Sequence, residues 1–137
     1  MNIPWTGVNL WAVLAGTVAS MILGGLWYSV LFGKVWLKLM GWKKEDIRKG
    51  DVNQAMAQTI VWAIVKAYGM ALLVSAAGVQ GAADGLVLGA LVSALIVLPT
   101  IGTNYAFESK PPALLALTVG NHAAALLALG AILGAWR

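Results

Sequence analysis

One lysine and one histidine lie inside long apolar stretches of this chain, where charged or ionisable groups are rare. Lys66 falls within an apolar run from about 56 to 77, and His122 falls within another from about 113 to 136. A charged group at mid-bilayer costs about 2.5–3.5 kcal/mol on insertion scales, so its presence calls for a compensating role. A buried lysine can bind an anion or exchange protons, and an imidazole can relay protons because it ionises near neutral pH.

Polar residues in the other apolar runs could complete a site around these two. If their helices begin near Met56 and Pro112, Lys66 and His122 each lie on the order of 10 residues inside and at similar depth. The third run adds polar residues spaced for one helical face, namely Ser93, Thr100, Asn104 and Glu108. We expect a substrate or proton pathway in one half of a bundle, built from Lys66, His122, Asn104, Glu108, Thr100, Tyr28 and Tyr105.

Each of these residues also has a simpler explanation. Gln54 and Gln58 could delay membrane entry of the second run, and Lys66 would then be shallow enough to extend its amine to the headgroups. A lone histidine is more often a hydrogen-bonded packing residue than a ligand. Glu108 could pair with Lys110 at the surface, a contact that contributes little.

Catalytic and metal-binding patterns are missing from the sequence. There is no cysteine and no second histidine, so a thiolate or polyhistidine metal site is not expected. No nucleophile elbow, phosphate-binding glycine loop or pair of carboxylates at a suitable depth is found. We therefore expect neither an enzyme, nor a metal ion, nor a cofactor.

The elements that must position the polar residues are transmembrane helices. The chain has 137 residues, of which 61% are hydrophobic and 10% are charged, whereas soluble domains carry about 25% charged residues. About 20 mostly apolar residues span a bilayer, and four such runs fit. The sequence predicts an all-α, integral membrane four-helix transmembrane bundle forming a single domain over 1–137, with spans of about 5–31, 56–77, 85–107 and 113–136.

A basic, amphipathic segment follows the first span. Residues 34–40 alternate basic and apolar types, which predicts a short interfacial helix ended by Gly41, and a charged loop of about 34–54 surrounds it. By the positive-inside rule the first and third loops face the cytoplasm and both termini lie outside. The net charge is +4, but the basic residues cluster in one loop and do not line a face together with aromatic residues. We therefore expect no nucleic-acid partner. The basic residues on that side are Lys34, Lys38, Lys43, Lys44, Arg48, Lys49 and Lys110.

Small residues recur at every fourth position of each predicted span. In lipid, such residues let helix backbones approach closely, which favours intramolecular packing of the bundle. The fourth span carries two sets on different faces, and Gly130 and Gly134 form the second. We expect this second face to be the one available for a homo-oligomer.

Five short segments together resemble one family. The chain is similar to bacterial membrane proteins grouped as domain of unknown function 1761, over nearly its whole length. The resemblance implies a small four-span protein of the bacterial cytoplasmic membrane and no established activity. It is carried by Trp27-Tyr28, Phe32-Gly33-Lys34-Val35-Trp36, Thr103-Asn104-Tyr105-Ala106-Phe107-Glu108, Asn121-His122 and Ala131-Ile132-Leu133-Gly134-Ala135-Trp136.

Two functions of different kinds fit these features. The first is a small-solute or proton-linked transporter or channel that uses the polar site. The alternative is a non-catalytic scaffold or lipid-binding assembly module, in which the basic loop meets anionic lipid at about 1 kcal/mol per basic residue. The residues expected to contact headgroups are Lys34, Lys38, Lys43, Lys44, Arg48, Lys49 and Trp36.

Overall fold

The computed structural model describes residues 3–47 and 51–137, and these ranges contain helices joined by short connections. Arg48 and Lys49, both expected to contact lipid, lie outside the described residues. In chain order the elements are α1 (Leu10–Leu26), η1 (Trp27–Leu31, a π-helical turn), α2 (Gly33–Met40), α3 (Lys44–Ile47), α4 (Val52–Ala76), α5 (Ala82–Val92), η2 (Ser93–Val97, also π-helical), α6 (Leu98–Phe107) and α7 (Pro112–Ala135).

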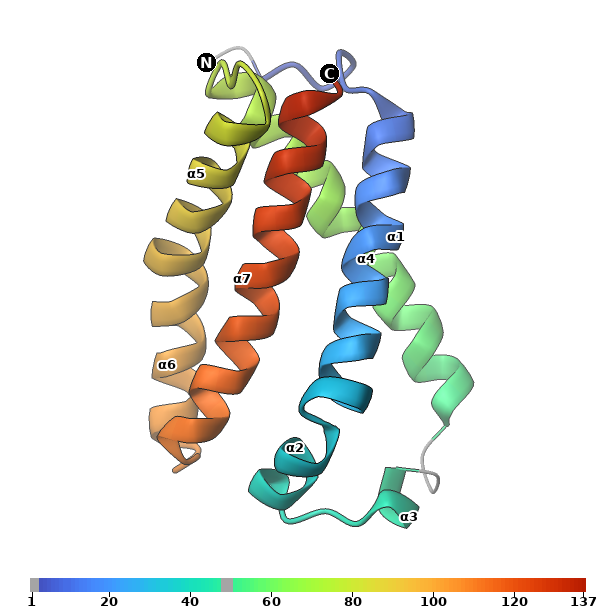
Figure 1. The fold of residues 1–137 in the computed structure, drawn as a ribbon, viewed down its shortest axis with the longest axis vertical. Coiled ribbons are helices and arrows are strands. Elements are labelled where there is room, and N and C mark those ends of the chain that lie inside the picture. Colours follow the sequence, from blue (N-terminus) through green and yellow to red (C-terminus); the bar gives the residue numbers. More distant parts are fainter. Residues whose placement is uncertain (1–2, 48–50) are drawn as a thin grey trace.

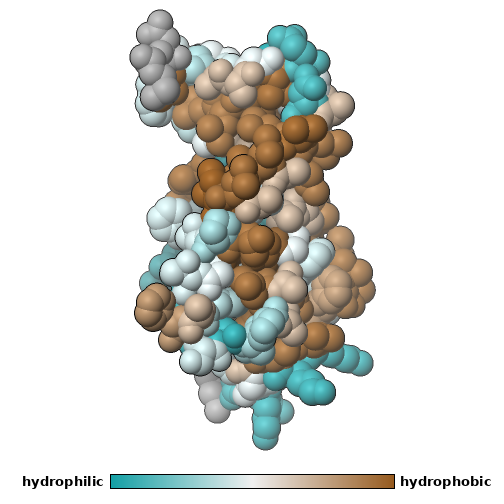
Figure 2. Space-filling view, turned by 90° about the vertical axis from the view of Figure 1, so that its left-hand side faces the viewer, coloured by the Kyte–Doolittle hydropathy of each residue, from teal (hydrophilic) through white to brown (hydrophobic). Residues whose placement is uncertain are grey.

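Four long helices form the bundle, which confirms the predicted all-α membrane architecture. Each is long and apolar enough to cross a membrane: Leu10–Leu31, Val52–Ala76, Ala82–Phe107 and Pro112–Ala135. Figure 2 shows the hydropathy of one face, with hydrophobic residues across its upper part, paler and polar residues mixed into its lower half, and hydrophilic groups projecting at the lower end.

The central helix is α7, which packs against α1, α4 and α5 (Figure 1). Side chains from α1, α4 and α7 form the main core, and Leu129, Ala67 and Ala12 within it are completely buried. Both chain ends lie at the top of Figure 1, and we call this the terminal end. The opposite end carries α2, α3 and the α6–α7 turn, and we call it the basic end because Lys34, Lys38, Lys43, Lys44 and Lys110 belong to it.

Glycines bring α5 and α7 into backbone contact. A Cβ atom added to Gly85 would overlap the Gly130 carbonyl oxygen, and one added to Gly134 would overlap the Gly81 carbonyl oxygen. Close packing through small residues is the main source of helix association in lipid. The expectation that Gly130 and Gly134 form a spare face for a second copy is therefore wrong, because α5 of the same chain occupies that face.

Helix ends depart from the predicted spans where a side chain caps the backbone. The first helix begins at Leu10 rather than near Trp5, because the Asn9 side chain accepts hydrogen bonds from the amides of residues 11 and 12 at 3.0 and 3.2 Å. The second long helix begins at Val52, since Asp51 accepts from the Gln54 amide at 3.0 Å. Gly41 ends α2 in the left-handed region, as its position predicts.

Two π-helical turns interrupt the long helices. In η2 the amide of Leu98 bonds back five residues to the Ser93 carbonyl, and Pro99 follows at the start of α6. Proline lacks an amide proton and crowds the carbonyl four residues earlier, which an added residue in the turn relieves. In η1 the Phe32 amide bonds to the Trp27 carbonyl at 2.9 Å, and Gly33 then begins α2.

Candidate functional site

A cavity of about 590 Å³ lies between α1, α4 and α7. This volume is within the range of about 300–1,000 Å³ that small-molecule sites occupy. Its walls come from three of the four long helices and not from the α5–α6 helix. They are lined by Ser20, Met21, Gly24, Gly25, Tyr28, Val52, Ala55, Met56, Thr59, Trp62, Ala63, Lys66, Asn121 and His122.

The cavity exists because the first half of α4 leans away from α1 and α7 (Figure 1). Every residue from 51 to 62 is exposed, and Ala63 is the first buried residue of the helix. Beyond it Ala67, Met70 and Val74 recur on one face and pack into the core. The helix is thus anchored by its second half only, and a wedge-shaped space opens toward the basic end.

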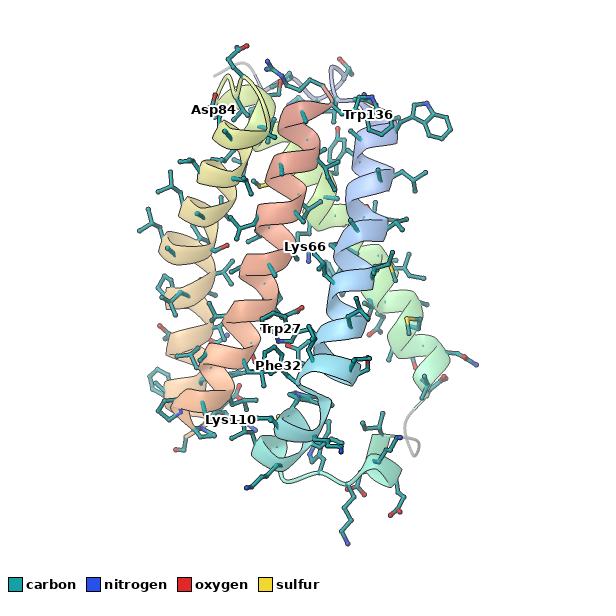
Figure 3. All side chains as sticks on the ribbon, viewed as in Figure 1. Trp27, Phe32, Lys66, Asp84, Lys110 and Trp136 are labelled. Atoms are coloured by element: carbon teal, nitrogen blue, oxygen red, sulfur yellow. The ribbon has the colours of Figure 1, made fainter. Side chains whose placement is uncertain are left out.

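Lys66 lies near the top of this wedge and close to mid-height of the bundle (Figure 3). At about 1.5 Å per residue it is about 21 Å from Val52 and about 15 Å from Ala76, the two ends of α4. Among the described residues its amine has neither a hydrogen-bond partner nor an ion-pair partner. The cavity therefore contains a half-buried amine that has no acidic partner among the described residues.

Asn121 and His122 face the same space from α7. The Asn121 side-chain oxygen is buried and has no hydrogen-bond partner among the described residues. His122 lines the same cavity as Lys66, and its ring makes no hydrogen bond to any described residue. An unpaired amine, an unsatisfied amide oxygen and an imidazole without a described partner thus line one cavity.

Tyr28 extends the polar group toward the basic end. Its hydroxyl is near enough to the Thr118 and Asn121 side chains to interact with both. The Tyr105 hydroxyl lies 3.1 Å from the Thr118 hydroxyl, so α6 touches this group at a single point. The polar side chains therefore form a short row that extends from Lys66 toward the basic end as far as Tyr105.

The neighbouring Trp27 fixes the end of α1 to α7 (Figure 3). Its indole nitrogen donates a 3.0 Å hydrogen bond to the Leu117 carbonyl, and its ring covers Gly120 so closely that a Cβ there would lie 2.9 Å from it. The Phe32 ring packs beside the indole, with ring centroids 4.6 Å apart. These contacts hold one wall of the cavity in place while the facing half of α4 is free of such contacts.

Four residues expected at the site do not line the cavity, and of these Tyr105 only contacts Thr118 beside it. Thr100 and Asn104 are exposed on α6 and Glu108 is exposed directly after it, and the Thr100 hydroxyl bonds to the Ile96 carbonyl of its own helix at 2.6 Å. The α5–α6 helix packs on the side of α7 away from the wedge. Ser93 is buried against α7, but the π turn that starts there adds a residue and rotates the later part of the helix, so the predicted polar face does not continue.

Sequence reasoning missed Asn121, Thr118, Thr59 and Trp62 as members of this region. Asn121 stands next to His122, and two adjacent polar residues in an apolar run are a usable signal. The sequence contains no such signal for Trp62, because this residue is typical of an ordinary lipid-facing aromatic. No group of three histidine, cysteine or acidic residues that could hold a metal ion occurs in the part of the chain that the structure describes.

The basic end presents a second surface, formed by α2. Lys34 and Lys38 are exposed, while Trp36 packs between Tyr28 and Trp42 with ring centroids 5.4 and 5.7 Å away. Tryptophan rings favour the interface between lipid and water. This arrangement is typical of a helix that lies along a membrane surface.

The terminal end is closed by contacts between segments far apart in the sequence. The Tyr68 hydroxyl donates a 2.6 Å hydrogen bond to the Trp5 carbonyl, and Arg137 donates to the Gln80 side chain at 3.1 Å. The packed core of α1, α4 and α7 lies between these contacts and the cavity. The cavity is therefore continuous with the basic end and separated from the terminal end.

Comparison with known proteins identifies one family. The family model described as protein of unknown function (DUF1761) matches residues 11–134, which is most of the chain. No curated protein and no solved structure matches.

Proposed function

The chain belongs to the DUF1761 family of proteins of unknown function, and from this premise we propose that it is a membrane transporter or channel for a small anionic solute. The observation that carries the proposal is Lys66, whose amine has no partner among the described residues and lines a cavity at mid-height of a membrane-spanning bundle. A cation in such surroundings is stabilised most by an anion that enters with it.

The depth of Lys66 favours binding over extension to the headgroups. Both ends of α4 lie about 15 Å or more from this residue, which is beyond the reach of a four-carbon side chain. His122 is placed to exchange a proton with the solute or with water in the cavity. Coupling to protons is thus a natural extension of the proposal.

The shape of the cavity supports access from one side at a time. It reaches the basic end, while packed residues and the Tyr68–Trp5 hydrogen bond close the terminal end. With the basic end in the cytoplasm and both termini outside, the described conformation would admit solute from the cytoplasm. Release on the other side would require α4 to close on α1 and the contacts at the terminal end to part.

Assembly of several copies is part of this proposal. A chain of this size has only α4, α1 and α7 around its cavity, and the outward surfaces of α1 and α4 are rich in exposed large apolar residues. A homo-oligomer would enclose the wedge more fully than lipid does. Native mass spectrometry of protein released from nanodiscs gives the copy number, and a monomer that is fully active would refute this part.

The test is anion flux in proteoliposomes containing purified protein. Replacement of Lys66 by leucine should lower flux about tenfold or more, because a charge-assisted contact of about 1.5–3 kcal/mol is lost. Lys66→Arg should retain part of the flux, and His122→Leu should abolish any dependence on a proton gradient. Lys43→Leu, at an exposed position of the basic end, is the control. Flux that is unchanged in both Lys66→Leu and His122→Leu would refute the proposal.

A second function is favoured by the surface of α2. Its exposed lysines and packed tryptophans fit a module that binds anionic lipid and assists assembly, without transport. In that case Lys34→Gln with Lys38→Gln would weaken binding to liposomes containing phosphatidylglycerol and would impair function. Lys66→Leu would then be silent, which is the opposite of the result expected for the transporter.

A further inference from the structure

We infer that the ligand of this cavity is a single-chain anionic amphiphile, a long-chain carboxylate whose head meets Lys66 and whose chain lies along the first half of α4. This inference rests on the anion site of the proposed function, though not on transport itself, and names the class of ligand for that site. Three features of the cavity carry it: the number of its charges, the chemistry of its walls and the way it opens.

The charge of the cavity fits one carboxylate. Lys66 is the only lysine or arginine that lines it among the described residues, and no acidic side chain lines it there. His122 stands beside Lys66 and has no other described partner, so its ring can donate to the same anion. A group with two negative charges would leave one of them without a fixed cation in a low-dielectric site.

The walls between this polar end and the basic end are largely apolar. Most of the side chains that line the cavity there are apolar, and Thr59, Ser20 and Tyr28 are the polar ones among them. The apolar residues include Ala63, Trp62, Met56 and Val52 on α4, and Met21 on α1. Methionine adapts its shape to flexible apolar partners, and tryptophan offers a broad flat surface. A compact hydrated ion would make no apolar contact with these side chains, whereas an alkyl chain would pack against them.

The wedge is open to the side as well as to the end. All residues from 51 to 62 are exposed, so no segment within the described residues covers the gap between this half of α4 and the α1–α7 pair. In a bilayer such a gap must be filled by apolar chains. The length of α4 from Lys66 to Val52 is about 21 Å, which an extended acyl chain can follow. A ligand of this kind could therefore enter from the bilayer without crossing water.

A glycine on α1 offers a way to obstruct the alkyl chain of the ligand without removing the Lys66 amine. A Cβ atom added to Gly25 would meet no atom within 4 Å, and Gly25 lines the cavity, so Gly25→Leu would place its added side chain at the wedge from a position that is open at Cβ. Gly69 on α4 is equally free of neighbours but does not line the cavity. Gly69→Leu is therefore a matched control for the same change in size and apolarity.

The experiment uses the full chain in nanodiscs and a doxyl-labelled stearate, whose immobilisation is followed by electron paramagnetic resonance. We expect saturable binding that unlabelled oleate displaces and acetate or inorganic phosphate does not. Lys66→Gln should weaken binding about tenfold or more, and Gly25→Leu should weaken it similarly. Gly69→Leu and Lys110→Gln, at positions that do not line the cavity, should leave it unchanged. Size-exclusion profiles and helical content show whether each variant is folded.

The outcomes separate this inference from the proposed function. Flux of acetate or phosphate that depends on Lys66, without saturable stearate binding, would overturn the inference and leave the transporter intact. Saturable stearate binding that depends on Lys66, without movement of any anion across proteoliposomes, would support the inference and overturn transport. Stearate binding that is equal in Lys66→Gln, Gly25→Leu and the native chain would overturn the inference, since the lipid surface alone would then explain it.

Discussion

Replacing Gly85 by alanine tests the packing that holds α5 against α7. The added Cβ would overlap the Gly130 carbonyl oxygen and would lie 2.5 Å from the Gly130 carbonyl carbon and 3.3 Å from the Ala131 amide nitrogen. Ordinary contact begins at about 3.4 Å, so the two backbones must separate by about 0.9 Å to relieve the carbon contact alone. Neither side can yield by a side-chain rotation, because both atoms belong to backbone.

The expected loss of stability follows from two opposing effects. Overpacking of a close contact costs about 1–3 kcal/mol, and a clash between backbones belongs at the upper end of that range. Alanine is favoured over glycine in a helix by about 0.8–1.0 kcal/mol, which offsets part of the loss. We therefore expect Gly85→Ala to lower the free energy of unfolding by about 1–2 kcal/mol.

Steric trapping in bicelles measures this free energy, and two glycines give a graded comparison. At Gly69 a Cβ meets nothing within 4 Å, so Gly69→Ala should be neutral or stabilising. At Gly16 the nearest atom is the end of the Leu129 side chain at 2.6 Å, which can move, so Gly16→Ala should fall between the two. A Gly85→Ala protein as stable as Gly69→Ala would show that α5 and α7 are not in backbone contact.

Two further substitutions test the local contacts that shape the site. Trp27→Phe removes the hydrogen bond to the Leu117 carbonyl, and we expect a loss of about 0.5–1.5 kcal/mol in the same unfolding assay, together with faster hydrogen exchange at the start of α2. An unchanged stability would mean that the indole does not tie α1 to α7. Asn9→Ala removes the cap of α1 and should cost about 1 kcal/mol, whereas Asn9→Asp should retain most of the stability. Equal loss in both Asn9 variants would contradict the capping role.

The fold could be predicted from the sequence to the level of helices but not to the level of their partners. The length and apolarity of four runs are sufficient for membrane-spanning helices, and Gly41 marks a helix end by its conformational freedom. The spacing of small residues showed that each helix can pack closely. It could not show that Gly130 faces Gly85 of the same chain, because many pairings of such faces have similar energies.

The candidate site was predictable where it depended on depth and unpredictable where it depended on rotation about a helix axis. Counting residues into each helix predicted that Lys66 and His122 lie in the same region, and both line the cavity, although α4 begins at Val52 rather than at Met56 and Lys66 is therefore further from its helix start than expected. The polar residues of α6 were placed wrongly, because the π turn after Ser93 changes which face they occupy. The lean of α4, which creates the cavity, is a tertiary property and has no signal in its own sequence.

The most direct test of the central claim is thiol labelling of Lys66→Cys in oriented proteoliposomes, since the native chain has no cysteine. Ala67→Cys is the control, because Ala67 is the next residue and is fully buried in the core. A small water-soluble methanethiosulfonate reagent should label position 66 when it is added on the side of the basic end and should fail from the other side. Position 67 should stay unlabelled from both sides. Labelling of position 66 from the terminal side, or equal protection of both positions, would contradict a cavity that joins Lys66 to the basic end.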